Sequence, residues 1–286
     1  VVYVAADRWT TMRVLAAERR VIAAASRETD TTLCVDPRAI DAAIEARPSL
    51  TREQRRMVES LCGSGRAVDV VVGRAGAGKT FTLDAVREAF EASGHQVIGV
   101  SLAARAAREL ESGSGIHSST AHAFHGQLDN GRRRFRPGDV LVVDEAGMLG
   151  TILMADLVER ATASGGKVIL VGDPKQLPPI EAGGLFASLA NRVPIVELVE
   201  NRRQRDPEER FIANALRKGL TELAVRRLDR HGRVTIAHNS DVLRDQMTLD
   251  WFEQHTTGRD VVMGAVHRSD VADLNERAHL LLESGG

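Results

Sequence analysis

The pattern of apolar and polar positions divides the chain into a helical start and a longer stretch in which strands and helices alternate. Apolar residues recur at near-helical spacing across residues 7–27, which predicts an amphipathic helix. A second helix is predicted to begin at Asp36 and Pro37, a capping residue followed by proline at the first helical position. A third follows Thr51, which stands three positions before Gln54 as in a capping box.

From Val68 onward, short β-branched runs alternate with helical stretches. Such alternation predicts a parallel sheet with crossover helices. Further strands are predicted near residues 233–237 and 261–266, with a helix after Asp270, so a second α/β unit is expected to start after about residue 205. The runs that predict the first sheet are VDVVV (68–72), QVIGVS (96–101), DVLVVD (139–144), KVILVG (167–172) and PIVELV (194–199).

Composition narrows the class of protein. The 286 residues are 43% hydrophobic and 27% charged, which is ordinary for globular domains, and their number suits one large or two ordinary domains. A net charge of -1 leaves no overall basic surplus, so any nucleic-acid site must be local. The sequence has no apolar run of membrane-spanning length and no signal-peptide pattern. Cys34 and Cys62 have no ligand-like spacing, so we expect reduced thiols in a cytoplasmic protein without a membrane partner.

The lysines point to a phosphate site. Of 38 basic residues only Lys79, Lys167, Lys175 and Lys218 are lysine. Lys79 lies in GRAGAGKT, Gly73 to Thr80, which fits G-x-x-x-x-G-K-[ST] between a predicted strand and a predicted helix. Glycines let backbone N–H groups surround phosphate oxygens, and a compact ammonium reaches the β- and γ-phosphates where a wide guanidinium would not fit. The alternative is a glycine-rich turn with an incidental lysine. A phosphate loop predicts ATP as cofactor, with the Thr80 hydroxyl on Mg²⁺.

Two later segments supply matching chemistry. The run DVLVVDEAG places Asp144 and Glu145 at the end of a buried strand. Asp144 would hold Mg²⁺ through its water shell, and Glu145 would orient and deprotonate the attacking water. Alternatively, the two acids cap the following helix. In GDPKQLPPI, Gln176 stands beside paired prolines, so a rigid turn would aim its amide at a γ-phosphate unless the segment is an ordinary proline-rich turn.

Taken in order, these motifs resemble a known family. The segments LTREQ, GRAGAGKT, DEAG, GDPKQLPPI and NRRQ are similar to the ATPase motifs of superfamily 1 DNA helicases of the RecD-like branch, and within it to the helicase region of conjugative relaxases (MobF type). The likeness spans roughly residues 9–282. It implies a P-loop α/β fold with RecA-like sheets, and ATP hydrolysis coupled to 5′-to-3′ movement on single-stranded DNA.

The resemblance also implies roles for individual residues. Gln54 would read the adenine, although the capping-box spacing offers a purely structural explanation. Arg203 would be the arginine finger, with Arg202 and Arg205 as competing choices and an exposed charge run as the alternative. The expected nucleotide-binding set is Gln54, Gly73, Gly76, Ala77, Gly78, Lys79, Thr80 and Phe81; the expected catalytic set is Glu145, Gln176 and Arg203; and the expected metal ligands are Thr80 and Asp144.

DNA contacts are expected from the segments after the second predicted strand. Ser101, Thr120 and His122 would meet phosphates or sugars of single-stranded DNA. A zinc site at His117, His122 and His125 is disfavoured because no fourth ligand is evident. The arginine-rich run around Phe135 is equally compatible with a stacking surface for DNA and with a solvated hairpin, and Phe124 is expected in the core.

The chain departs from a complete helicase of this family. The two further motifs of the second ATPase-like domain are not found, and no relaxase tyrosine and histidine cluster precedes residue 1. We therefore expect a fragment of a larger polypeptide with weak or no ATPase by itself. The expected parts are a helical segment (1–48), a first RecA-like domain (49–204) and an incomplete second one (205–286). A stand-alone RecD-like repair helicase and an ATP-binding scaffold without turnover remain as alternatives.

Overall fold

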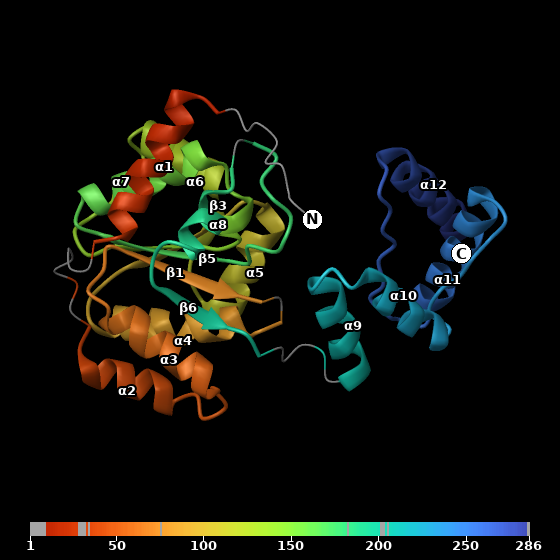
Figure 1. The fold of residues 1–286 in the computed structure, drawn as a ribbon, viewed down its shortest axis with the longest axis horizontal. Helices are drawn as coiled ribbons and strands as arrows, with labels where there is room; N and C mark the ends of the chain where they lie inside the picture. The colour runs from red at the N-terminus through yellow and green to blue at the C-terminus, as the bar shows by residue number, and fades with distance from the viewer. Residues whose placement is uncertain are drawn as a thin grey trace, which may run out of the picture. The chain divides into compact units, whose positions relative to one another are not determined.

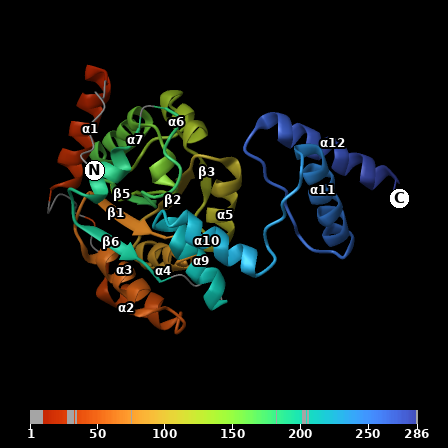
Figure 2. The same cartoon turned by 45° about the vertical axis from the view of Figure 1, so that its right-hand side comes forward.

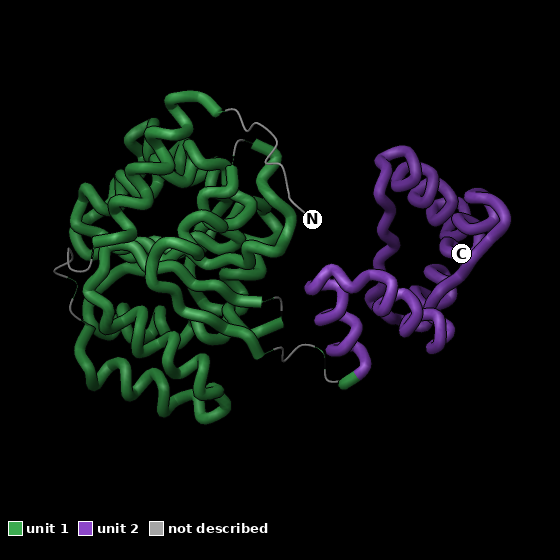
Figure 3. Tube along the Cα trace, in the orientation of Figure 1, with its two compact units in different colours: residues 1–207 green, residues 208–286 purple. Residues whose placement is uncertain are grey.

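The computed structural model describes residues 10–27, 33, 35–74, 76–181, 183–200, 204 and 206–284. The chain divides into two compact units, Val1–Pro207 and Glu208–Gly286 (Figure 3). In the described residues the first unit carries a β-sheet with helices on both faces, and the second unit is helical.

The sheet of the first unit is parallel and confirms the α/β prediction. Its six described strands follow the order β3-β2-β4-β5-β1-β6, and every pairing is parallel. The neighbours β4, β5 and β1 place the loops that follow them along one edge, which is where ligands bind in open α/β sheets. The strands are β1 (Val68–Gly73), β2 (Val97–Ser101), β3 (Ser118–Thr120), β4 (Val140–Val143), β5 (Lys167–Gly172) and β6 (Ile195–Leu198).

Helices cover both faces of this sheet. Figures 1 and 2 both show α1, α6 and α7 on one side of the sheet and α2, α3 and α4 on the other. Each side has its own buried apolar cluster, around Phe124 and Phe186 on the first and around Met57 and Phe90 on the second. The helices are α1 (Met12–Ala25), α2 (Pro37–Glu45), α3 (Arg52–Gly63), α4 (Lys79–Ala92), α5 (Ala104–Ser114), α6 (Ala121–Asp129), α7 (Thr151–Ala163) and α8 (Leu185–Ala190), with the 3₁₀ turn η1 (Ala146–Met148).

The first three helices form where the sequence predicts them. Helix α1 is capped by the Thr11 side chain, and α2 by Asp36 with Pro37 at its first position. The Thr51–Gln54 capping box of α3 is present in both directions. Within the first unit, α1 packs on α7 and α2 packs on α4.

The second unit corrects one prediction from the sequence. Its described elements are α9 (Pro207–Arg217), α10 (Thr221–Arg230), α11 (Ser240–Thr256) and α12 (Arg268–Ser284), and residues 233–237 and 261–266 form no strand. The helix expected after Asp270 is present. A strand forms only beside a partner that satisfies its backbone groups, and no strand follows β6 among the described residues. The Val261 carbonyl instead accepts a hydrogen bond from Trp251 Nε1 at 3.1 Å.

Candidate nucleotide site

The loop between β1 and α4 surrounds the Lys79 side chain. The Lys79 ammonium donates hydrogen bonds to the carbonyl oxygens of Gly73 at 3.0 Å and Arg74 at 3.3 Å. A Cβ atom on Gly73 would lie 2.5 Å from Lys79 Cδ, so only glycine leaves room for the lysine chain. The lysine is the first residue of α4, where the helix dipole favours anions. Lys79 is therefore held at the start of α4, at the helix end where a phosphate would bind.

The side chain of Gln54 is hydrogen bonded to this loop. Its Nε2 donates to the Ala77 carbonyl at 3.1 Å, and its Oε1 accepts from the Thr51 backbone N–H at 3.0 Å. The residue is 2% exposed, and Gly78, at a φ of 76°, passes so close that a Cβ there would lie 2.4 Å from Gln54 Nε2. Both polar ends of the Gln54 side chain thus bond to the protein itself. This geometry favours the structural explanation of Gln54.

Asp144 and Glu145 occupy the end of β4. The Glu145 backbone N–H donates to Asp144 Oδ1 at 2.9 Å, and Ser101 Oγ donates to Glu145 Oε2 at 3.4 Å. Among the described residues Glu145 is the one non-glycine with positive φ, at 53°. A left-handed conformation disfavours a residue with a Cβ atom, and such strain concentrates at functional sites.

Burial raises the pKa of both carboxyl groups. Burial raises the pKa of Asp144 above its ordinary value, against the lowering effects of the Glu145 N–H and the Lys79 charge. Burial also raises the pKa of Glu145, and the neighbouring Asp144 charge raises it further. A carboxylate with a raised pKa is a stronger base, which suits proton abstraction from water near neutral pH.

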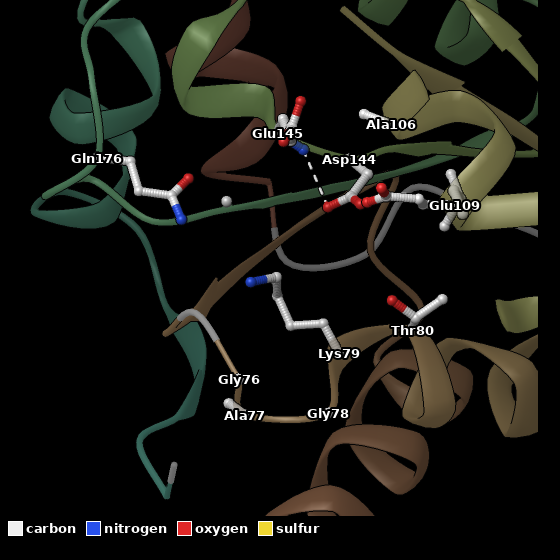
Figure 4. A pocket seen from close by; sticks show the side chains of 12 residues that line it. Gly76, Ala77, Gly78, Lys79, Thr80, Ala106, Glu109, Asp144, Glu145 and Gln176 are labelled. Carbon is white, nitrogen blue, oxygen red and sulfur yellow. Dashed lines mark hydrogen bonds between the residues drawn. The ribbon is translucent and has the colours of Figure 1, made fainter. Parts of the chain in front are cut away.

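A pocket of about 260 Å³ joins these groups. Figure 4 shows the ends of the Lys79 and Gln176 side chains pointing into the space that Asp144 borders. The Thr80 hydroxyl and the Asp144 carboxylate are hard oxygen ligands of the kind Mg²⁺ prefers, so the donor set fits that ion. Twelve residues line the pocket: Gly76, Ala77, Gly78, Lys79, Thr80, Ala106, Glu109, Leu110, Asp144, Glu145, Gly172 and Gln176.

The structure adds residues that the motifs did not single out. Ala106, Glu109 and Leu110 come from α5, and Gly172 ends β5. Glu109 contributes a third carboxylate, and its charge further raises the pKa of both Asp144 and Glu145. The helical spacing of residues 106, 109 and 110 indicates one face of α5, but the sequence carries no signal that this face turns toward the phosphate loop.

Three of the expected nucleotide-site residues do not line this pocket. Gly73 ends β1, where its carbonyl accepts from the Lys79 ammonium, and Gln54 bonds to the loop through the Ala77 carbonyl. Phe81 is 36% exposed on the first turn of α4. Arg202, Arg203 and Arg205, the three choices for the arginine finger, lie outside the described residues.

The expected DNA-contact residues divide into buried and accessible ones. Ser101 is fully buried and its hydroxyl contacts Glu145, so its geometry favours a role in the nucleotide pocket over a DNA contact. Thr120 caps α6 by accepting from the Ala123 N–H at 3.2 Å. His122 is exposed on the same helix.

The core prediction for Phe124 is confirmed. Phe124 is fully buried, and Phe135 packs edge-on against it with ring centroids 5.6 Å apart. Phe135 is therefore engaged in packing, which favours the structural explanation of the arginine-rich run over a stacking surface for bases. Within the described residues, no group of three or more His, Cys, Asp or Glu side chains that could hold a metal ion is found.

The comparisons with known proteins agree with this geometry. A family model described as "AAA domain" matches residues 49–239, the part of the chain that carries the phosphate loop and the acidic pair. The chain belongs to this AAA domain family. It is 36% identical over 252 residues to the conjugal transfer protein TraA of Rhizobium radiobacter, covering 88% of this chain and 23% of TraA. It is 36% identical over 164 residues to the ATP-dependent RecD2 DNA helicase of Deinococcus radiodurans, covering 56% of this chain and 22% of that protein.

These relatives are much longer than the chain, which spans between a fifth and a quarter of each. Among solved structures, a Pif1 helicase from Bacteroides in complex with ADP-AlF3 and ssDNA gives a TM-score of 0.48 at 18% identity, covering 77% of this chain and 61% of that chain. At that score the superposition establishes no shared fold. The α/β assignment rests on the strand order and the family match. In the part of the chain that the structure describes, no helix has the length and hydropathy of a membrane span.

Proposed function

We propose that this chain is the ATP-hydrolysing motor segment of a DNA helicase that belongs to a conjugative DNA-transfer relaxase. The observation that carries the proposal is the shared pocket of Lys79, Thr80, Asp144, Glu145 and Gln176. The 36% identity to a conjugal transfer protein over 88% of the chain supports the conjugative assignment. Single-stranded DNA, traversed 5′ to 3′, is the proposed track, and the other domains of a larger polypeptide are the proposed partners.

Each pocket residue has a proposed part in hydrolysis. Lys79 and the loop amides bind the β- and γ-phosphates, and Thr80 and Asp144 hold Mg²⁺. The bound ion would neutralise charge that develops on the phosphate oxygens. Glu145 takes the proton of the attacking water, and Gln176 reports the γ-phosphate to the DNA-binding elements.

Other roles rest on the sequence pattern alone. Arg203 is the proposed arginine finger, because such a cation stabilises charge on the transferring phosphoryl group. Thr120 and His122 are proposed DNA contacts. We propose that Gln54 acts on the nucleotide through Ala77 and the loop rather than by reading the base directly, since its amide is already bonded at both ends.

The decisive experiment measures ATP turnover with and without single-stranded DNA, and unwinding of a duplex with a 5′ tail. It uses this chain and longer polypeptides that contain it. Stimulation of turnover by single-stranded DNA and unwinding from the 5′ tail are the expected results. Tight ATP binding without turnover in every length tested would identify an ATP-binding scaffold instead. Unwinding only from a 3′ tail would refute the proposed polarity.

A further inference from the structure

The first turn of α3 contacts both the loop that lines the pocket and the segment that follows β6. Gln54 holds the phosphate loop through the Ala77 carbonyl, as described above. Its neighbour Glu53 reaches the end of β6, where Oε2 accepts hydrogen bonds from the backbone N–H groups of Val199 at 2.9 Å and Glu200 at 3.1 Å. Adjacent side chains of one helical turn thus bond to the loop that meets phosphate and to the segment that leads to Arg203.

The segment held by Glu53 continues directly from the sheet. Leu198 is the last residue of β6 and pairs in register with Gly73 at the start of the phosphate loop. The Arg74 N–H then donates to the Leu198 carbonyl at 3.0 Å. Beyond Leu198 the β1 ladder ends, and the next two backbone amides turn to the Glu53 carboxylate instead. Where the pairing of β6 with β1 ends, the Glu53 carboxylate accepts the hydrogen bonds of the next two backbone N–H groups.

Three properties of a carboxylate suit the position of Glu53. An ionised carboxylate is an acceptor with several lone-pair sites, so one oxygen can serve two consecutive N–H groups. Bonds to a charged acceptor are stronger than those to a neutral one. Glu53 also lies in the first turn of α3, where a negative charge is favoured by the helix dipole. We call the two hydrogen bonds from Val199 and Glu200 to Glu53 the clamp. The charge of Glu53 thus strengthens these bonds and also suits its own helix end.

We propose that Glu53 is a positioning residue that fixes the backbone ahead of Arg203 in register with the phosphate loop. Arg203 follows Glu200 by three residues in the sequence. An arginine finger acts only if its guanidinium reaches the charge that develops on the transferring phosphoryl group. The inference rests on the proposed function, because it assigns Glu53 a task in ATP hydrolysis that Arg203 performs.

The test compares a ground-state nucleotide with a transition-state mimic. Affinities of the full chain for a fluorescent ADP are measured with Mg²⁺, with and without aluminium fluoride, for Glu53→Ala and Glu53→Gln. We expect Glu53→Ala to leave ADP affinity within about twofold and to weaken the aluminium fluoride complex about tenfold. Glu53→Gln, whose amide oxygen still accepts both N–H bonds, should recover part of the loss. The matched control is Glu59→Ala, an exposed acid on the same helix.

A double-mutant comparison connects Glu53 to the arginine. In an Arg203→Ala background, Glu53→Ala should have little further effect on the aluminium fluoride complex, because the group that it positions is gone. Full additivity of the two losses would overturn the proposal. So would an equal loss of ADP and of the aluminium fluoride complex, since that is the mark of a general structural role.

Two further measurements separate the possible failures. Hydrogen exchange of a peptide covering Val199 and Glu200 should accelerate in Glu53→Ala and not in Glu59→Ala, and unchanged exchange would overturn the clamp itself. If Lys79→Ala does not weaken ADP binding, or Arg203→Ala leaves the aluminium fluoride complex intact, the proposed nucleotide site or its arginine assignment fails. If both respond and Glu53→Ala does not, only the positioning role fails.

Discussion

The side-chain amide of Gln54 and the backbone carbonyl of Ala77 are hydrogen bonded at 3.1 Å, which joins the capped start of α3 to the phosphate loop. One residue therefore completes a helix cap and restrains a loop that lines the pocket. A mutation at Gln54 changes both, and the base of the nucleotide is not needed to explain either effect.

Gln54→Ala should lower affinity for ATP and for GTP by the same factor. The mutation also removes half of the capping box and leaves the Ala77 carbonyl without its side-chain donor, so the free energy of unfolding should fall by about 1–2 kcal/mol. Calorimetric titration with both nucleotides checks the first effect and urea denaturation the second. A loss confined to ATP would instead establish that Gln54 reads adenine.

Lys79→Ala should weaken nucleotide binding by at least about 100-fold, because no other cation lines the pocket among the described residues. Calorimetry with ADP and with ATP measures the change. Lys218→Ala, which removes an exposed lysine from the second unit, serves as the control and should bind normally. Unchanged affinity in Lys79→Ala would refute the phosphate-loop assignment.

Glu145→Gln should bind ATP normally and lose turnover by at least about 100-fold, since the amide keeps the size of the side chain but cannot accept a proton from water. The measurement requires a polypeptide containing this chain that turns ATP over. Normal hydrolysis in this variant would show that another group is the base, and Glu109 would then be the next carboxylate of the pocket to test.

Cys62 should resist alkylation in the folded protein. Burial raises the pKa of its thiol to about 12, with a smaller raising effect from Asp69 and an opposing effect from Lys167. At pH 8 only about one thiol in ten thousand is then ionised, and the thiolate is the reactive form. A Cys34→Ser variant isolates the signal. Iodoacetamide should modify Cys62 in urea but not in buffer, and rapid labelling under native conditions would contradict the burial.

Lys167→Met should lower the free energy of unfolding by about 3–5 kcal/mol, because it strands a buried charge. Lys167 and Asp69 form an ion pair at 2.6 Å with exposures of only 2% and 4%, and the Lys167 ammonium also donates to Ser64 Oγ and the Arg66 carbonyl. Arg226→Ala, which breaks an exposed pair with Glu222, should cost under about 1 kcal/mol. Urea denaturation of both variants measures the contrast, and equal losses would contradict it.

The sequence predicts the first unit well where signals are local. Alternating β-branched runs locate five of the described strands, and the caps at Asp36 and Thr51 locate two helices. That Lys79 and Asp144 line one pocket follows from their fixed spacing after β1 and β4. The short strand β3 carries no such run, because its residues Ser118 to Thr120 gain their strand character from pairing with β2.

Long-range geometry could not be predicted in the same way. Whether Glu109 faces Asp144 depends on how α5 packs. The two hydrogen bonds that Glu53 accepts come from backbone N–H groups 146 and 147 positions further along the chain. The strands expected at 233–237 and 261–266 were predicted from residue type alone. A β-branched run is compatible with an extended loop when no partner strand lies beside it.

The left-handed backbone of Glu145, at a φ of 53°, lowers the stability of the fold while it places the carboxylate proposed for ATP turnover. A left-handed glutamate costs on the order of 1 kcal/mol, and glycine or asparagine would occupy the same conformation more easily. Laboratory selection for heat resistance alone would therefore favour replacing this glutamate, whereas selection that also demands ATP turnover would retain it. The two kinds of selection should diverge at this one position.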